Sequence, residues 1–317
     1  IGLRFDFANV SINGKDYGLY YLEERYEKRL IENNGFREGI IFKINDDGLN
    51  IYGMKKISEV KSLSNQLNTL RRLVNSFLTD KIEANKLFDL KKFASLCVVS
   101  DIMGQKHAIL RDNVRFYFNP ITNLIEPIGR EWGYLKKGVL SKLRKSNDNI
   151  TSLTIQSPDQ RVMHDTKLKK DKVLKKLIDS FQFEEQYIHE AKILSNEAYL
   201  DSIININQDQ IDLLLNKIHK HNPFYIFPLG VIHDNQEYIR NIIHTSLPDI
   251  NVFYNQADEN VITLDVENLL DLPIEIQYCT YNSQKIIFPS KRILLKSKHK
   301  ASVNIQKINM NHDGKID

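Results

Sequence analysis

The dipeptide Asn13-Gly14 constrains the start of this chain more than any other feature of the sequence. It lies within FANVSINGKDYGLYYLEE, residues 7–24, where apolar and polar residues alternate on both sides. Asn and Gly tolerate positive φ, so this pair between alternating segments is the strongest short-range signal for a β-hairpin. The sequence therefore predicts two antiparallel strands that turn at Asn13-Gly14, with Gly14 and Gly18 as turn glycines.

A short helix and a third strand are predicted after this hairpin. The amphipathic segment Arg25 to Asn33 favours a helix, which Asn34-Gly35 ends. The next strand, Gly39 to Ile44, contains Lys43 as the single lysine in an otherwise apolar run. A lysine in a strand is commonly an edge or solvent-facing residue, whereas a lysine held inside a site has a function, and the strand alone leaves both interpretations open.

Two longer helices and a second hairpin come next. Apolar residues recur at helical spacing between Val60 and Phe77 and again between Phe93 and Met103. A loop, GQKHAILRDN, then leads into NVRFYFNPITNLIEPIG, residues 113–129, which favours a hairpin with core-facing aromatic residues. Glu131 follows this hairpin. Glu59 is placed in the first turn of the first long helix, where an acid also favours the helix N-terminus.

The remainder of the chain divides into a helical part and a strand-rich part. Residues 165–243 have mostly helical spacing, whereas short alternating runs separated by turn residues begin at Val252. We therefore predict an α+β chain with a boundary near Pro248. The first domain is residues 1–247, comprising hairpin and lysine strand (1–57), helices and second hairpin (58–135) and helical support (136–247). Residues 248–317 form a small antiparallel, β-sandwich-like domain.

Composition excludes several classes of protein. The 44 basic and 40 acidic residues leave a formal net charge of only +4, which does not indicate a nucleic-acid partner. No apolar run approaches the roughly 20 residues of a membrane-spanning helix. Lysines gather at 136–145 and 167–176, as solvated surface or as a positive rim beside a phosphate site. Cys97 and Cys279, the only cysteines, lie in separate apolar stretches and are expected to be unpaired.

The order of the predicted elements is that of protein kinases: a hairpin, a strand with an inward lysine, helices, a loop with an Asn, a second hairpin and an acid. Three segments, VSINGKDYGLYYLEE, EGIIFK and HAILRDNVRFYFNPITNLIEPIG, also occur in the same order as motifs of one family. In these segments the chain resembles the CotH kinase family, which is named for a spore coat component. The resemblance covers about the first 135 residues well and the helices up to residue 243 loosely.

The resemblance implies an atypical protein-kinase-like fold of two lobes, with ATP and Mg²⁺ or Mn²⁺ as cofactors and protein Ser or Thr as acceptor. Lys43 matches the phosphate-binding lysine, with Glu59 as the positional candidate for its ion-pair partner. Asn113 matches the metal-binding Asn, and Glu131 stands where the family has a metal-binding Asp. Glutamate keeps an oxygen ligand but extends it by one methylene, a change that octahedral Mg²⁺ tolerates poorly.

The catalytic base of the kinase loop is the second departure from the family pattern. That Asp precedes the Asn by five residues, and the corresponding position here is Ala108. His107 and Asp112 flank the gap, so either is a candidate catalytic residue, His107 as proton acceptor and Asp112 as acceptor or second metal ligand. Asp101, on the helix before the loop, either fixes the loop backbone or contacts a ligand.

Two functions remain open from the sequence. One is an ATP- and metal-dependent kinase that phosphorylates protein Ser or Thr. The other is a weakly active pseudokinase, or a coat or cell-surface assembly module that binds partners through its terminal β domain. The resemblance implies an exported, surface- or coat-associated bacterial protein. Because the sequence opens at Ile1 without an initiator Met, we interpret it as a fragment whose targeting signals lie elsewhere.

Overall fold

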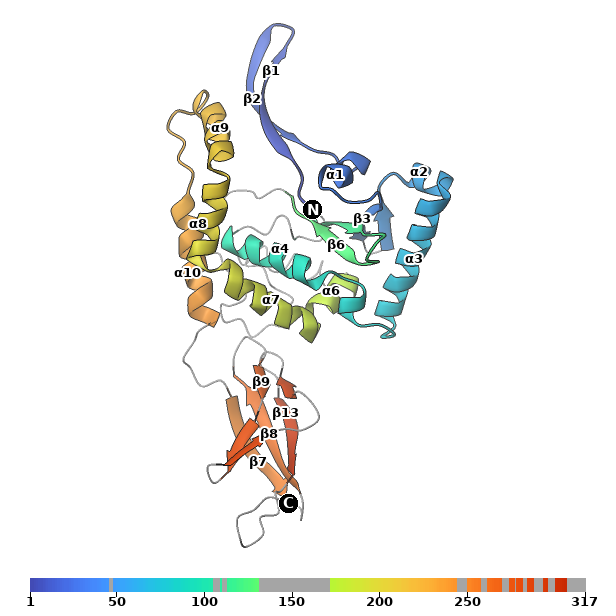
Figure 1. Ribbon diagram of the computed structural model, residues 1–317, viewed down its shortest axis with the longest axis vertical. Helices are drawn as coiled ribbons and strands as arrows, with labels where there is room; N and C mark the ends of the chain where they lie inside the picture. The colour runs from blue at the N-terminus through green and yellow to red at the C-terminus, as the bar shows by residue number, and fades with distance from the viewer. Residues whose placement is uncertain are drawn as a thin grey trace. The chain divides into compact units, whose positions relative to one another are not determined.

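The chain folds as an α+β protein with two compact units (Figure 1). The computed structural model describes residues 1–45, 48–104, 109, 113–130, 172–243, 250–257, 261–269, 274–276, 278–281, 284–287, 293–295 and 300–306. The first unit holds the described residues up to Ile243, and the second holds those from Ile250 onward. Each unit has its own hydrophobic core.

A four-stranded antiparallel sheet lies at the centre of the first unit, with strand order β4-β3-β5-β6. Its strands are β3 (Ile40–Asn45), β4 (Gly48–Ile51), β5 (Arg115–Phe118) and β6 (Ile125–Ile128). In the register between β3 and β5, Ile40 lies opposite Phe118 and Phe42 opposite Phe116. The strand that contains Lys43 and the second hairpin therefore belong to the same sheet.

The alternation of side chains along β3 separates two cores. Ile40, Phe42 and Ile44 are buried in the larger core, which the helices complete. Ile41 faces the opposite side and joins a smaller core with Tyr117. Because successive side chains of a strand point to opposite faces, Lys43 lies on the same face as Ile41.

Helices cover the larger core. They are α2 (Met54–Glu59), α3 (Lys61–Leu78), the 3-10 turn η1 (Ala84–Lys86), α4 (Leu90–Ile102), α6 (Lys172–Ile178), α7 (Phe181–Leu194), α8 (Glu197–Ile206) and α10 (Leu229–Ile243), whereas α9 (Gln208–His219) has no residue in this core. The pair α4 and α7 runs side by side (Figure 1), joined by the rings of Phe93 and Phe183, whose centroids are 5.5 Å apart, and by a 2.8 Å hydrogen bond from Ser95 to Glu190. The N-cap side chains of Asp89 and Ser180 begin these two helices.

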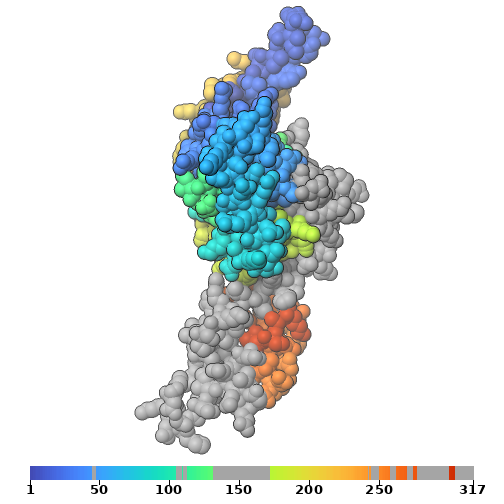
Figure 2. Space-filling model, turned by 90° about the vertical axis from the view of Figure 1, so that its right-hand side faces the viewer, coloured from blue at the N-terminus to red at the C-terminus, as the bar shows by residue number. Residues whose placement is uncertain are grey.

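The first hairpin stands out from the body of this unit, as Figures 1 and 2 show for the dark blue strands. It consists of β1 (Phe5–Ile12) and β2 (Lys15–Glu23), which pair only with each other among the described strands, and α1 (Lys28–Asn33) follows it. Asn13 and Gly14 both have positive φ, 53° and 80°, as the predicted two-residue turn requires. The hairpin contacts α9 through an ion pair of 2.5 Å between Lys217 and Asp6.

The second unit is built from short antiparallel strands. They are β7 (Ile250–Ala257), β8 (Val261–Asn268), β9 (Ile274–Ile276), β10 (Tyr278–Tyr281), β11 (Gln284–Ile287), β12 (Ile293–Leu295) and β13 (Lys300–Gln306). The three-stranded sheet of this unit has the order β13-β8-β7. Val266 and Val303 are the buried centre of its small core.

Most predicted elements of the first unit are present, with two differences near Lys43. The elements β4 and α2 were not predicted. Glu59 was expected in the first turn of the long helix, and that placement is wrong, because Glu59 is the last residue of α2 and α3 begins at Lys61. The chain changes direction at Val60, whose backbone is extended, so the apolar spacing that runs across it belongs to two helices.

Close packing at the start of β3 leads to a stability prediction. A Cβ atom on Gly39 would lie 2.4 Å from the carbonyl oxygen of Phe118 and 2.7 Å from the ring of Tyr117. Overpacking of this kind destabilises proteins by about 1–3 kcal/mol. We expect Gly39→Ala to lower the free energy of unfolding by that amount in urea denaturation.

The matched control is Gly230→Ala in α10, where a Cβ meets no atom within 4 Å. Alanine is the better helix former, so this variant should be unchanged or more stable by up to about 1 kcal/mol. Equal stability of the Gly39→Ala protein and the native protein would refute the close-packing argument.

Candidate phosphate-binding face

Lys43 lies half-buried in the middle of β3, on the face of the sheet opposite the helices α3 and α4. It pairs with Asn50 on β4. Extending the register of β3 and β5 by one residue places Arg115 beside it on the other side. Two cationic side chains from strands far apart in the sequence thus share one face of the sheet.

Two tyrosines support the arginine of this pair. The guanidinium of Arg115 donates a hydrogen bond to the hydroxyl of Tyr52, and its central carbon lies 5.5 Å from the ring centroid of Tyr26. The rings of Tyr26 and Tyr52 are themselves 5.4 Å apart. Stacking on aromatic faces is favourable for arginine and holds its planar donor groups in one orientation.

Arg130 approaches the same tyrosine from the end of β6. Its guanidinium carbon is 5.7 Å from the ring centroid of Tyr26, and its Nη2 atom is 3.7 Å from Oε2 of Glu23, at the end of β2. Arg130 is largely buried, with 16% of its side chain exposed. Arg115 and Arg130, which both approach the Tyr26 ring, form what we call the Tyr26 cluster, together with Tyr26, Tyr52 and Glu23.

The hydroxyl of Tyr26 is buried and makes no hydrogen bond within the described part of the chain. Burial raises the pKa of Tyr26 to about 12, against the smaller opposing influence of the Arg130 charge. A buried hydroxyl without a partner is unfavourable by about 1–3 kcal/mol. This group is therefore a donor available to an acceptor that enters the cluster.

The Asn and the buried Asp of the predicted catalytic region lie on either side of the loop. Asn113 is half-buried and directly precedes Val114 and β5, two residues before Arg115. Asp101 is buried near the end of α4 and accepts a hydrogen bond from the hydroxyl of Tyr187 on α7. Burial and the Asp101 carboxylate hold the pKa of Tyr187 well above its ordinary value. Asp101 therefore links the end of α4, which precedes the loop, to α7.

The structure describes three residues of the predicted site, Lys43, Glu59 and Asn113. Lys43 and Asn113 are at the sheet face and at the start of the adjoining strand. Glu59 is exposed at the end of α2, and it forms no ion pair with Lys43 although both residues are described. The other candidates, His107, Asp112 and Glu131, lie outside the described residues, as does Ala108.

The cationic donors of this face fit a phosphate-bearing ligand, because lysine and arginine are the usual protein partners of phosphate oxygens. For a metal, the described residues offer less: no group of three His, Cys, Asp or Glu side chains among them is placed to bind an ion. None of the described helices combines the length and the apolar character needed to span a membrane.

Comparison with known families decides the relationship of this chain. The family model described as CotH kinase protein matches residues 2–246. The chain belongs to the CotH kinase family. No curated protein matches its sequence. The CotH match includes the sheet, the Tyr26 cluster and all described helices, and it ends between α10 and β7.

Sequence reasoning proposed Lys43 as a site residue of this CotH protein but gave no sign of the aromatic residues near it. Nothing in the sequence separates Arg115 and Arg130 from ordinary surface arginines. Tyr26 and Tyr52 carried no signal, because they flank α1 and β4 and meet only through the fold. The strand register and the contacts with the Tyr26 ring show that both arginines lie near Tyr26.

The unpartnered hydroxyl of Tyr26 gives a second prediction. We expect Tyr26→Phe to raise the free energy of unfolding of the ligand-free protein by about 1 kcal/mol, because the variant removes a buried donor without a partner and keeps the ring. Urea denaturation at neutral pH measures this change. Tyr199→Phe is the control, since Tyr199 is exposed. A less stable Tyr26→Phe protein would show that the hydroxyl has a stabilising partner.

The same variant has a defined pH dependence. The pKa of Tyr26 is raised from 10.0 in the unfolded chain to about 12 in the folded protein. Stability from the protonated phenol is therefore fully present below pH 10 and is lost as the pH rises towards about 12. Tyr26→Phe should flatten this part of the stability profile, and an unchanged profile would contradict the assignment.

Proposed function

We propose that this CotH family member is a kinase-like protein that binds ATP and a divalent metal, Mg²⁺ or Mn²⁺, and phosphorylates protein Ser or Thr. The proposal is supported by the β3–β5 register, which, extended by one residue, puts Lys43 and Arg115 on one sheet face, with Asn113 two residues before β5. Family membership supports a kinase-related activity. A kinase-like arrangement of two lobes is part of the proposal.

In this proposal each residue has a stated task. Lys43 and Arg115 hold the phosphates of ATP, and Arg130 and the Tyr26 hydroxyl are further donors at the same face. Asn113 and Glu131 bind the metal, which neutralises phosphate charge when it is bound. The acceptor hydroxyl loses its proton to His107 or Asp112 as its oxygen forms a bond to the γ-phosphorus and the bond from that phosphorus to ADP breaks.

Nucleotide binding is tested by stability. A ligand that binds only the folded state raises the free energy of unfolding by about 2.7 kcal/mol at a hundred times its dissociation constant. We expect ATP with Mg²⁺ to raise the melting temperature, and Lys43→Ala to weaken ATP binding at least about tenfold, because a hydrogen bond to a charged group is lost. Lys55→Ala, at an exposed position of α2, is the control.

Equal ATP affinity of Lys43→Ala and the native protein would show that Lys43 does not bind the phosphates. Absence of any ATP effect on the native protein would reject nucleotide binding altogether.

Phosphoryl transfer is tested separately with labelled ATP, Mg²⁺ or Mn²⁺ and an acidic protein acceptor. We expect incorporation of label, into the acceptor or into the chain itself, that is lost in Asn113→Ala. Loss is expected because misplacing a metal-bound phosphate by about 1 Å costs on the order of a hundredfold in rate. Label that persists in Asn113→Ala would contradict the role of this residue.

A second function, a pseudokinase or assembly module, is favoured by the β unit. β7 is an edge strand of its sheet, and its Val252, Phe253 and Tyr254 are exposed, Tyr254 to 69%. Exposed edge strands with large apolar side chains are sites of association with other chains. ATP binding without label transfer would select the pseudokinase, and neither property would select the assembly module.

A further inference from the structure

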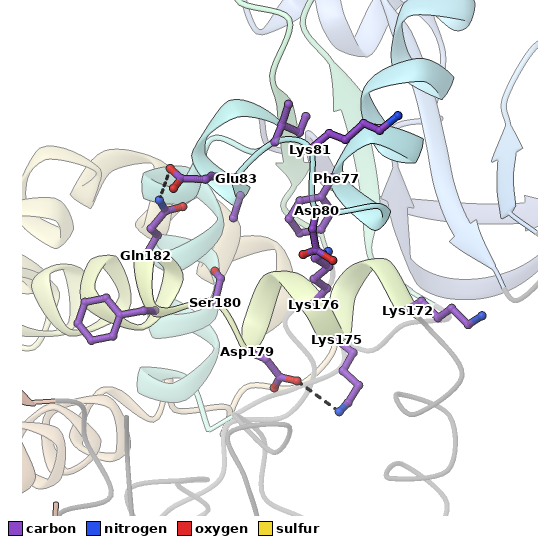
Figure 3. A pocket seen from close by; sticks show the side chains of 13 residues that line it. Phe77, Asp80, Lys81, Glu83, Lys172, Lys175, Lys176, Asp179, Ser180 and Gln182 are labelled. Carbon is purple, nitrogen blue, oxygen red and sulfur yellow. Dashed lines mark hydrogen bonds and ion pairs between the residues drawn. The ribbon is translucent and has the colours of Figure 1, made fainter. Parts of the chain in front are cut away.

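A pocket of about 690 Å³ lies in the first unit at the end of α3, away from the sheet face that contains Lys43. It is formed between the turn that follows α3 and the junction of α6 with α7 (Figure 3). Its position is at the opposite end of α3 from α2, which follows the Lys43 sheet in the chain. No role in the proposed phosphoryl transfer uses these residues.

Apolar groups form part of the pocket wall. Phe77 is 2% exposed and Ala84 is buried, while Ile82 is half-buried between them in the chain. The ammonium of Lys176 lies 5.2 Å from the ring centroid of Phe77, so it is held against this wall. A ligand that enters therefore meets an apolar surface beside the ion pair of Lys176 and Asp80.

Four lysines and three carboxylates line the pocket, which leaves one net positive charge. Lys176 is paired with Asp80 at 2.5 Å, and Lys175 with Asp179 at 3.3 Å. The third carboxylate, that of Glu83, accepts a 2.8 Å hydrogen bond from Gln182. Two of the three carboxylates are thus neutralised by lysines, whereas Glu83 is hydrogen-bonded to a neutral amide.

Lys81 and Lys172 remain as the cations of the pocket without an ion-pair partner among the described residues. Both are exposed, and Figure 3 shows their ammonium groups extending to the same side of the view. α7 also begins at the pocket, so the positive end of its dipole adds to the potential there. The opening is therefore positive, whereas its wall is partly apolar.

We propose that this pocket is a docking site for an acidic peptide segment of another protein, with carboxylates at Lys81 and Lys172 and an apolar side chain against Phe77 and Ile82. The Glu83 carboxylate, which has no cationic partner among the described residues, would repel a polyphosphate or a nucleic acid, whose charges are dense. A peptide with spaced carboxylates avoids Glu83 and supplies the apolar group. The inference does not depend on the proposed kinase function.

The test is binding of a short fluorescent peptide in which glutamates flank one phenylalanine, measured by fluorescence anisotropy. We expect saturable binding to the native protein, and binding about tenfold weaker to the double variant Lys81→Glu/Lys172→Glu, since two attractive charge pairs become repulsive. Affinity should also fall as salt is added. Lys81→Arg/Lys172→Arg should keep the affinity, because charge is retained.

The matched control is Lys61→Glu/Lys91→Glu, which reverses two exposed lysines in the first turns of α3 and α4, outside the pocket. An unchanged affinity in this control supports a local site. Equal weakening in both double variants would overturn the proposal in favour of general electrostatic attraction, as would the absence of saturable binding to the native protein. Thermal unfolding of each variant shows that it is folded.

Two further measurements separate the pocket from the Lys43 face. Peptide binding should persist in Lys43→Ala and in the presence of ATP, and replacing the phenylalanine by alanine in the peptide should weaken it. Binding that is lost in Lys43→Ala but kept in the pocket variant would place the peptide on the sheet face and overturn the proposal. A protein that fails to bind ATP but shows the pocket-dependent affinity would lose only the proposed kinase function.

Discussion

The pairing of β3 with β5 is the interaction on which the arrangement of the first unit depends. It joins residues 40–42 to residues 116–118 by antiparallel backbone pairing. The helices α2, α3 and α4 lie between these two segments in the chain. Without it, Lys43 and Arg115 would have no common surface. The pairing also fixes the division of cores, because a slip of one residue would turn every side chain of β3 to the other face. Phe42 and Phe116, stacked 5.6 Å apart in the larger core, hold the register.

The smaller core holds in place the sheet face that contains Lys43 and Arg115. Leu30 and Ile31 of α1 pack with Ile41 and Tyr117 there, which anchors the segment that carries Tyr26. The hydroxyl of Tyr117 donates to the carbonyl oxygen of Arg37, so the connection between α1 and β3 is fixed as well. Tyr26 is thereby held close to the guanidinium groups of Arg115 and Arg130. Glu23 is the acid beside Arg130, and an incoming phosphate would compete with it for that guanidinium.

Local patterns in the sequence predicted most of the secondary structure of the first unit. Asn13-Gly14 predicted the first hairpin, and the apolar run around Lys43 predicted β3, because both signals are short-range. The break at Val60 was not visible, since α2 and α3 continue the same apolar spacing on either side of one extended residue. The Tyr26 cluster was equally hidden, because its tyrosines and arginines come from segments that only the β3–β5 pairing brings together. His107, Asp112 and Glu131 lie outside the described residues, so their roles stay predictions from their positions in the sequence.

The attachment of the first hairpin has a consequence for the dynamics of the molecule. Among the described strands β1 and β2 pair only with each other, and their side chains Phe5, Tyr20 and Tyr21 are about half exposed. Their link to α9 and the turn after it consists of surface contacts, such as the 2.8 Å hydrogen bond between His221 and Asn9. Elements with few buried contacts open locally, whereas a buried central strand opens only when the whole domain unfolds. We therefore expect the amide hydrogens of the hairpin to exchange with solvent through local openings that leave β3, the strand that holds Lys43, closed.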